Sequence, residues 1–414
     1  MDYSGALSYL RGFERLGYRF RLENTRDLLD SLGFGFDGEI VHIAGTNGKG
    51  SCACVLDSIL RMSGRKVGFY TSPELIDFTE RVRVDGVQID RERFAELAGR
   101  LKPHIDSMGS KPTFFEATTA LALKHFADER VDVIILEVGM GGRLDSTNAV
   151  ESKLQVITNV EIDHTSYLGS TVGEIAVEKA GIIHGGSVVV TAASGEALDI
   201  ISSAAAERGS RVVKVGGDVV LCDVESSLDG VSFKMKTGRE SYVLRSPMRG
   251  GFQALNIACA VSAAEELGTT RGDILSAVPK AYWPGRLDLV RENPRVIVDS
   301  AHNAAGMRES LAFIRSLDYD RLVVVAGFMS DKEYKPMIGL LSEADVLIAT
   351  RADLKRALGA CEILKHADGV PVERVSDAVD HALSIASEDD LVLITGSIYV
   401  AGEAIRKWRD RIDL

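Results

Sequence analysis

Short apolar runs alternate with segments of helical periodicity along most of the chain. The runs at residues 39–44, 131–136 and 154–158 are typical of strands that are buried on both faces of a sheet. Residues 52–62 and 115–127 instead have the spacing of helices with an apolar face. This alternation predicts an α/β fold with a doubly wound, mainly parallel sheet. The other expected elements of this part are helices at 4–16, 25–33, 90–102, 172–179 and 196–208, and strands at 66–71, 187–191 and 211–215.

The pattern changes after residue 218. Short alternating segments predict a small antiparallel insert near residues 219–245, and a Pro-Gly pair at 284–285 marks a junction. The length of 414 residues also favours two domains. We therefore expect a P-loop domain at residues 1–286 and a smaller α/β domain at residues 287–414. The later elements are helices at 253–267, 272–279, 304–316, 334–342, 376–387 and 399–409, and strands at 296–298, 322–326, 346–349 and 391–394.

The strand at residues 39–44 ends in a glycine-rich turn that is followed by a lysine and a hydroxyl. Glycines let the main chain approach an anion, and N–H groups at the start of a helix bind phosphate. Lys49 would reach the terminal phosphates, and Ser51 or Thr46 would lie near a bound Mg²⁺. The common P-loop pattern has no residue between the lysine and the hydroxyl, whereas Gly50 stands there in this chain. We interpret the turn as a nucleotide-phosphate site rather than a plain turn before a buried helix; its residues are Gly45, Thr46, Asn47, Gly48, Lys49, Gly50 and Ser51.

Polar residues follow three further expected strands. Ser72 follows the strand at 66–71, Glu137 follows 131–136, and Asp163 and His164 come soon after 154–158. The carboxyl ends of parallel strands meet at one edge of a sheet, where ligands bind. A carboxylate between an apolar strand and a glycine-rich segment favours a metal ligand at Glu137 over an exposed salt bridge. By spacing alone, Ser72 is a turn residue, and Lys179 lies on a solvated helix face.

Composition restricts the partners. A net charge of −12 argues against nucleic acid as the main partner, because binding to a phosphate backbone needs a basic face. We see neither an apolar run that could span a bilayer nor a secretory signal near Met1. The odd number and scattered spacing of the five cysteines suggest neither disulfides nor a zinc site. We expect a cytoplasmic protein with reduced cysteines and no membrane partner.

Together these motifs resemble the folylpolyglutamate synthase/dihydrofolate synthase family within the Mur ligase superfamily. The resemblance covers nearly the whole chain, and its motifs follow one another in order. They are residues 42–51, 70–73, 80–81, 113–116, 137–148, 163–165, 168–169, 178–182, 283–286, 299–303, 331–333 and 396–397.

The resemblance implies an ATP-dependent amide ligase that adds L-glutamate to a pterin or folate carboxylate. The acid would attack the γ-phosphorus of MgATP and form an acyl phosphate. The amine of glutamate would attack that, and phosphate would leave. Because a carboxylate and a polyphosphate repel each other, cations must screen both. Lys49 and two Mg²⁺ ions would do so.

The resemblance also implies individual roles. One Mg²⁺ would bind Ser51 and Glu137, and the second would bind Glu137, Ser72 and His164. Lys179 would be carbamylated and face the second ion, which reverses the reading of a solvated helix face. Catalytic roles would fall to Lys49, Lys179, Asp299 and His302, and Gln253 and Asn256 would lie near the nucleotide base. Arg286, Asp299 and His302 would contact phosphates or ribose, and His302 and Ser397 would bind glutamate. Thr113 and Phe115 would hold the pterin, and Arg81 and Asp163 would also contact substrate.

Three features depart from the family pattern, namely Glu74, Ser300 and the segment 21–24. They leave the acceptor open between dihydropteroate, a folate that already carries glutamate, and another pterin or acidic acceptor. The alternative functions are a Mur-type ligase for a different carboxylate, a nucleotide-binding module without catalysis, and a small-molecule kinase. The second α/β domain without its own P-loop and residues 299–303 favour the ligase. By analogy with relatives we expect a monomer that binds only small molecules.

Overall fold

The structure is a computed structural model that describes residues 1–17 and 21–411, with side chains through residue 408. The chain forms two compact units, and each is described by itself. The first unit comprises residues 1–221, 235–242 and 255–280. The second comprises residues 222–234, 243–254 and 281–414. The domain boundary at residue 286 stays a prediction.

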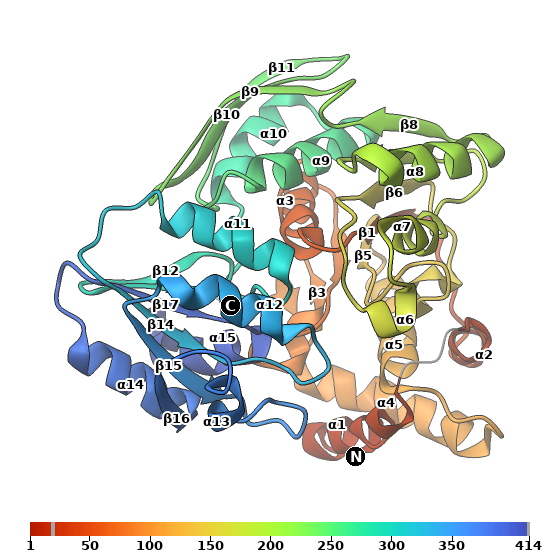
Figure 1. Ribbon diagram of the computed structural model, residues 1–414. Helices are drawn as coiled ribbons and strands as arrows, with labels where there is room; N and C mark the ends of the chain where they lie inside the picture. The colour runs from red at the N-terminus through yellow and green to blue at the C-terminus, as the bar shows by residue number, and fades with distance from the viewer. Residues whose placement is uncertain (18–20, 412–414) are drawn as a thin grey trace. The chain divides into compact units, whose positions relative to one another are not determined.

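The first unit contains an eight-stranded sheet in the order β4-β3-β2-β5-β1-β6-β7-β8 (Figure 1). All strands are parallel to their neighbours except β3 and β4, which form the antiparallel edge. The α/β class and the mainly parallel sheet are therefore confirmed. The bounds are β1 (Glu39–Ala44), β2 (Val67–Tyr70), β3 (Val82–Val84), β4 (Val87–Gln88), β5 (Val133–Glu137), β6 (Leu154–Ile157), β7 (Val188–Thr191) and β8 (Arg211–Lys214).

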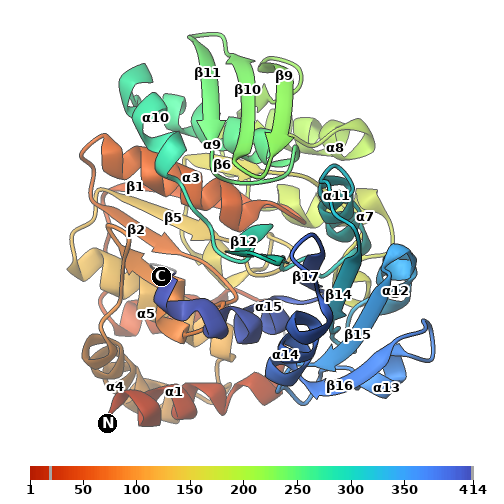
Figure 2. The ribbon, with the colours of Figure 1, turned by 90° about the vertical axis from the view of Figure 1, so that its left-hand side faces the viewer.

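Helices cover both faces of this sheet (Figure 2). On one face, α3 (Lys49–Met62) packs against β1, β2 and β5, and α10 (Arg271–Ala277) packs against α3. On the other face, α5 (Phe114–Asp128) contacts β2, and the apolar sides of its neighbouring helices complete a core that includes Phe94 and Phe126. The remaining helices of this part are α1 (Tyr3–Arg11), α2 (Glu23–Ser31), α4 (Arg91–Ser107), α6 (Thr165–Leu168), α7 (Val172–Ala180), α8 (Gly195–Glu207) and α9 (Gln253–Glu266).

The small sheet expected near residues 219–245 is present in the order β11-β10-β9. Its strands are β9 (Val220–Ser227), β10 (Gly230–Lys236) and β11 (Ser241–Ser246). Side chains alternate between buried and exposed along β11, which is the pattern that the sequence displays.

The second unit contains a six-stranded sheet in the order β12-β13-β17-β14-β15-β16. Only β12 is antiparallel to its neighbour. The two central strands are fully buried, as their apolar sequences predict. The elements are β12 (Asp288–Glu292), β13 (Arg295–Val298), α11 (Ala304–Ile314), β14 (Leu322–Ala326), α12 (Tyr334–Leu340), β15 (Val346–Arg351), α13 (Ala360–Ile363), β16 (Val370–Arg374), α14 (Val375–Ile385), β17 (Leu391–Thr395) and α15 (Ile398–Ile405).

Several expected boundaries are wrong. The helix expected at 4–16 ends at Arg11, and a separate 3₁₀ turn follows at Glu14–Leu16. The helix expected to end at 102 continues through Pro103 to Ser107. Sequence reasoning missed β3, β4, β12 and β16, which are short or polar strands. Of these, β4, β12 and β16 lie at sheet edges, and β3 lies next to the edge strand β4. Edge strands need fewer apolar residues, because one side of their backbone is not covered by another strand.

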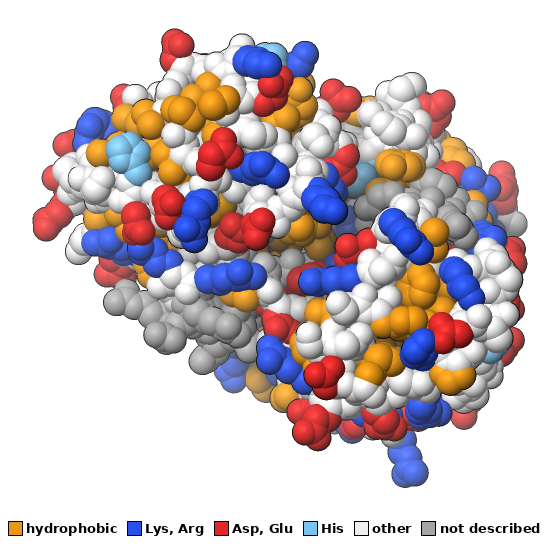
Figure 3. Space-filling view, turned by 90° about the horizontal axis from the view of Figure 1, so that it is seen from below, with side chains coloured by type: hydrophobic (Ala, Val, Ile, Leu, Met, Phe, Trp, Pro, Cys, Tyr) orange, Lys and Arg blue, Asp and Glu red, His pale blue; other side chains and the backbone are white. Residues whose placement is uncertain are grey.

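Two observations concern the surface. Within the described residues, every helix is too short or too polar to cross a bilayer. On the face that Figure 3 shows, Lys and Arg side chains are interspersed with Asp and Glu. Positive charge on this face is thus local rather than continuous.

His42 on β1 predicts a pH dependence of stability. Burial, together with nearby His184, lowers the pKa of His42 to about 3, and its Nε2 lies 2.7 Å from Thr147 Oγ1. The unfolded chain binds this proton near pH 6.5, so it holds more protons than the folded chain between pH 6.5 and 3. Stability should therefore fall as the pH falls below 6.5, by about 2 kcal/mol at pH 5 from this residue.

Urea unfolding at pH 5 and pH 7 measures this effect. The variant His42→Gln should lose less stability between the two pH values than the wild type. An equal loss in both proteins would show that another group causes the dependence.

Candidate active site

Four neighbouring parallel strands place the candidate residues at one edge of the first sheet. The order β2-β5-β1-β6 is continuous, and all four strands run in the same direction. Their carboxyl ends therefore lie side by side, and the chain leaves each of them into a polar segment. These segments contain residues 45–51, Ser72 and residues 158–164, and Glu137 is the last residue of β5. The expectation that one edge collects these groups agrees with the observed topology.

The glycine-rich turn is held by the segment after β6. The N–H groups of Thr46 and Asn47 donate to Asn159, at 3.0 Å to its carbonyl and 2.8 Å to its side-chain oxygen. The Thr46 hydroxyl donates to the Glu161 carbonyl at 3.1 Å and accepts the Glu161 N–H at 3.0 Å. The Thr46 side chain thus fixes the loop, which favours Ser51 over Thr46 as the hydroxyl that contacts a metal.

Two positions of the turn require glycine, because other residues lie too close to the main chain for a side chain to fit. Gly45 and Gly48 have φ of +151° and +81°, which disfavour a side chain. A Cβ at Gly45 would lie 1.9 Å from Thr158 Oγ1, and one at Gly48 would lie 2.1 Å from Asn256 Oδ1. The expected base-side residue Asn256 therefore lies directly against the turn. Gln253 is buried on the same helix, three positions earlier.

The variant Gly48→Ala should weaken nucleotide binding and destabilise the first unit. A left-handed φ with a Cβ costs on the order of 1 kcal/mol, and the contact with Asn256 adds to this. Gly64→Ala is the matched control, because Gly64 has a similar φ of +84° and no atom within 4 Å of the added Cβ.

Thermal unfolding and titration with ADP measure both effects. We expect Gly64→Ala to lose stability but to bind ADP as the wild type does. Equal ADP affinity in Gly48→Ala and Gly64→Ala would contradict a phosphate site at this turn.

Lys49 begins α3 and is half-buried. Its ammonium donates to the carbonyls of Gly45 at 3.0 Å and Thr46 at 3.2 Å. The positive charge is thus located at the turn itself, next to the N–H groups that start the helix. Both features favour anion binding at this position.

Glu137 joins the ends of two neighbouring strands. Its side chain is buried, and its Oε2 accepts a hydrogen bond from the Thr71 hydroxyl and the Ser72 N–H, the latter at 3.3 Å. The chain thereby brings Ser72 directly beside Glu137, as the proposed second metal site requires. Thr71 is a member of this cluster that sequence reasoning missed.

The donor set of this cluster fits a hard divalent cation. Carboxylate and hydroxyl oxygens suit Mg²⁺ or Mn²⁺. Among residues 1–17 and 21–411, no group of three or more His, Cys, Asp or Glu side chains is placed to hold a metal. At nucleotide sites Mg²⁺ is usually held by one or two carboxylates together with phosphate oxygens and water.

His164 stands at the start of α6 in a left-handed conformation, with φ of +53°. Its N–H donates to Asp163 Oδ1 at 2.7 Å, and its Nε2 lies 3.9 Å from Asp163 Oδ2. A non-glycine residue in this conformation is strained, and such strain is concentrated at functional sites. Asp163 orients His164 in this structure, and metal binding by His164 stays a prediction.

Lys179 is not on the solvated helix face that its spacing predicts. The helix periodicity predicts a solvated lysine, whereas its side chain is buried near the end of α7. The glycine-rich segment after β5 covers it, because a Cβ at Gly142 would lie only 3.2 Å from the Lys179 Cα. The Arg143 N–H also donates to the Glu178 carbonyl at 2.8 Å. Tertiary contact with this segment, rather than helix periodicity, decides its burial.

The expected pterin residues lie at the start of α5. Thr113 caps this helix, since its hydroxyl accepts the Glu116 N–H at 3.1 Å. Phe115 is half-buried, and its ring centroid lies 5.9 Å from that of Tyr70. A Cβ at Gly139 would lie 2.6 Å from Phe115 Cζ, so the ring lies against the segment that follows Glu137.

Asp145 is a residue of this region that sequence reasoning did not single out. Burial raises the pKa of Asp145, which accepts the N–H groups of Met140 at 2.9 Å and Thr147 at 3.0 Å. It therefore shapes the segment between Glu137 and Thr147. An Asp followed two positions later by Thr is the signal that could have predicted this turn.

The second unit places its own candidate residues at one sheet edge. Asp299 follows β13 and Ser397 follows the neighbouring parallel strand β17. Asp299 is buried and accepts the N–H groups of Leu287 and Ala301, both at 3.1 Å, and the Ser310 hydroxyl at 2.6 Å. Ser397 caps α15 by accepting the Val400 N–H at 3.2 Å.

Arg286 and His302 both contact the carbonyl of Ser300. Arg286 Nη1 donates to it at 3.3 Å, and His302 Nδ1 lies 3.1 Å away. A carbonyl only accepts hydrogen bonds, so Nδ1 carries the proton and Nε2 carries the lone pair in neutral His302. The Ser300 hydroxyl donates to the Gly285 carbonyl at 2.8 Å.

Comparison with known proteins decides the family. Residues 43–264 match the Mur ligase middle domain, and residues 285–398 match the Mur ligase glutamate ligase domain. The dihydrofolate synthase/folylpolyglutamate synthase of Bacillus subtilis is 36% identical, over 98% of each chain. The chain belongs to the folylpolyglutamate synthase/dihydrofolate synthase family.

Family members also differ in length. A probable bifunctional folylpolyglutamate synthase/dihydropteroate synthase of Haloferax volcanii is 37% identical over 99% of this chain. The present chain spans about half of that relative, 51% of its length. It spans a similar share, 52%, of the protein of the same description from Halobacterium salinarum.

Solved structures of the family have the same fold. E. coli FolC in complex with DHPP and ADP has a TM-score of 0.92 at 30% identity, covering 99% of this chain and 98% of that chain. A bifunctional folylpolyglutamate synthase/dihydrofolate synthase from Yersinia pestis, complexed with AMPPNP and Mn ion, has a TM-score of 0.89 at 29% identity, with the same coverage.

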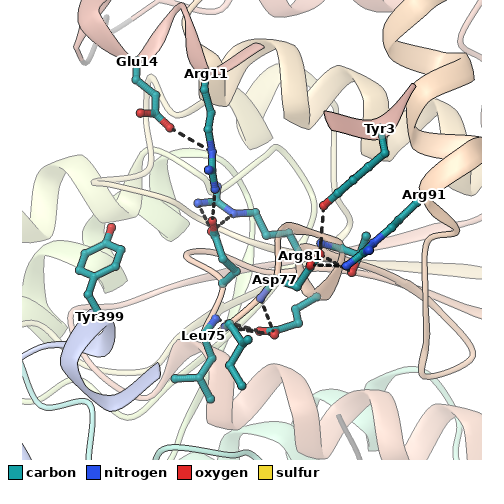
Figure 4. Close-up of polar contacts among 12 residues, drawn as sticks. Tyr3, Arg11, Glu14, Leu75, Asp77, Arg81, Arg91 and Tyr399 are labelled. Atoms are coloured by element: carbon teal, nitrogen blue, oxygen red, sulfur yellow. Dashed lines mark hydrogen bonds and ion pairs between the residues drawn. The ribbon is translucent and has the colours of Figure 1, made fainter. Parts of the chain in front are cut away.

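Glu74, a departure from the expected family pattern, lies in the segment between β2 and β3. Glu74 pairs with Arg81, whose side chain is largely buried. Figure 4 shows Arg81 within this group of polar contacts. Burial opposes ionisation of Glu74, but Arg81 and the other hydrogen-bond donors outweigh it, and the pKa of Glu74 is lowered. Arg81 therefore faces a negative charge from its own chain.

Proposed function

We propose that this protein is an ATP-dependent ligase that adds L-glutamate to the carboxylate of a pterin or folate through an acyl phosphate. The observation that carries the proposal is the shared edge of β2, β5, β1 and β6. There Lys49, Glu137 and Ser72 stand within an architecture whose relatives are described as folylpolyglutamate and dihydrofolate synthases. Family membership supports the second unit as the glutamate ligase part.

The chemical problem is the approach of two anions. The acceptor carboxylate attacks the γ-phosphorus, the bond to ADP breaks, and an acyl phosphate forms. The N–H groups and the Lys49 ammonium at residues 45–51 hold the phosphates and offset their charge. Glu137, Ser72, Ser51 and His164 would hold Mg²⁺, which when bound neutralises charge on the phosphate oxygens.

In the second step, the amine of glutamate attacks the acyl carbon and phosphate leaves. The amine must first lose a proton. In His302 the Nε2 lone pair can accept a proton, because Nδ1 donates to Ser300. Asp299, Arg286 and Ser397 complete the groups that we assign to ATP and glutamate in the second unit.

We assign Lys179 as a carbamylated residue. Lys179 is buried against the glycine-rich segment that follows Glu137, and this proximity to the proposed metal ligand supports the assignment. A high-resolution map of the ATP-bound protein tests it. Density for a carboxyl group on Nζ would support the carbamate, and a plain ammonium would contradict it.

An acceptor panel tests the function. Phosphate release with ATP and glutamate should depend on dihydropteroate or tetrahydrofolate and on glutamate itself. Release with a different acid would favour another Mur-type ligase. Transfer of phosphate to a product without glutamate would favour a kinase. ATP binding without turnover on any pair would favour a nucleotide-binding module. Sedimentation of the same preparation tests our proposal that the protein is a monomer.

A further inference from the structure

The segment between β2 and β3 continues directly from Ser72 at the shared sheet edge and is held by its own polar contacts. The Glu80 carboxylate accepts the N–H groups of Leu75 at 2.8 Å, Ile76 at 3.1 Å and Asp77 at 2.8 Å. Asp77 in turn caps the 3₁₀ helix Phe78–Arg81. Figure 4 shows these contacts converging on the loop. The loop therefore presents Arg81 in a fixed position.

The planar guanidinium of Arg81 contacts aromatic rings and also pairs with a carboxylate through its nitrogens. The guanidinium carbon lies 5.4 Å from the ring centroids of both Phe78 and Phe114. Its Nε donates to Glu74 Oε2 at 2.5 Å, and its Nη2 contacts the same oxygen. Side-chain exposure is only 10% for Arg81 and 16% for Glu74. Water therefore screens this pair less than it would an exposed ion pair.

A second arginine also contacts Glu74. Arg11 Nη2 lies 3.5 Å from Glu74 Oε1, and Arg11 Nε lies 3.8 Å from Glu14. The two arginines contact different oxygens of the same carboxylate, Arg11 at Oε1 and Arg81 at Oε2. These four side chains carry two positive and two negative charges, so the cluster is neutral overall.

We propose that Glu74 is a specificity-determining residue, an internal counter-ion that disfavours acceptors with a second carboxylate near Arg81. This inference rests on the proposed function. Dihydropteroate has one carboxylate, and that group reacts. A tetrahydrofolate that carries glutamate has, besides its reacting γ-carboxylate, an α-carboxylate that does not react. Only this second type of acceptor has a carboxylate that would be attracted to Arg81 if no carboxylate of the chain were paired with it.

The contacts between Arg81 and Glu74 make it unfavourable for a carboxylate of the acceptor to bind Arg81. An acceptor carboxylate could displace Glu74, which would leave a largely buried carboxylate without its main partner. It could otherwise bind beside the neutral pair and gain little attraction, because Glu74 repels it. Both routes penalise the doubly charged acceptor, and neither affects an acceptor whose only carboxylate is the reacting one.

The test compares two acceptors in three proteins. KM is measured for dihydropteroate and for tetrahydrofolate monoglutamate with the wild type, Glu74→Gln and Glu14→Gln. We expect Glu74→Gln to lower the ratio of the tetrahydrofolate KM to the dihydropteroate KM by roughly tenfold, the scale of one charged hydrogen bond. Glu14→Gln removes the same charge from the exposed partner of Arg11 and should leave the ratio unchanged.

Glu74→Asp restores the charge and should return the ratio to the wild-type value. If Glu74→Gln does not fold, Glu74→Ala and the salt dependence of both KM values in the wild type replace it. An unchanged ratio in the charge-removing variant would overturn the proposal, and so would an equal change of both KM values, which a merely structural role predicts. Absence of turnover with both acceptors in the wild type would instead reject the proposed function.

Discussion

Replacing Lys49 with alanine is expected to reduce glutamate-dependent phosphate release roughly a thousandfold, the scale of removing a cation from a transferring phosphate. The ammonium is positioned by the turn that it serves, through the carbonyls of Gly45 and Thr46. Loss of this charge leaves the N–H groups in place, so nucleotide binding should weaken less than turnover falls. Steady-state phosphate release and ADP titration separate the two effects.

Lys66→Ala provides the matched control for this variant. Lys66 precedes β2 and therefore lies at the opposite end of the strand from Ser72. It pairs with Glu129 at 3.0 Å and should contribute nothing to turnover. A tenfold loss of activity corresponds to only about 1.4 kcal/mol of transition-state stabilisation. If Lys49→Ala kept more than about a tenth of wild-type activity, the assigned role of Lys49 would be wrong.

The second large effect is expected for Glu137→Gln. An amide keeps the size of the side chain but removes the negative charge that a divalent cation needs. We expect the Mg²⁺ concentration for half-maximal activity to rise at least tenfold and the maximal rate to fall by about a hundredfold or more. Activity measured as a function of Mg²⁺ and of Mn²⁺ tests both effects.

Glu265→Gln controls for the general cost of changing a buried glutamate. Glu265 is buried and accepts hydrogen bonds from Thr237 at 2.9 Å and Tyr242 at 2.7 Å, and no metal role is assigned to it. This variant should lose stability without a change in metal dependence. The same Mg²⁺ curve for Glu137→Gln and the wild type would remove Glu137 from the metal site.

The candidate residues differ in how strong their local sequence signal is. A buried strand followed by glycines, lysine and a hydroxyl predicts residues 45–51, because strand, turn and helix start are all set by neighbouring residues. Glu137 has the same advantage, since it follows an apolar strand and precedes glycines. The weaker cases depend on distant segments. Neither the roles of Thr46 and Thr71 nor the shaping of a loop by Asp145 follows from spacing.

The sequence by itself determined the α/β class, the parallel strands and the strand ends at which polar groups gather, because hydrophobic periodicity and glycine position are local properties. Only the tertiary structure decided which strand ends are neighbours, that Lys179 is buried, and that Glu74 neutralises Arg81. Each of these depends on contacts between residues far apart in the chain, such as the segment after β5 against α7. Local periodicity carries no information about such contacts.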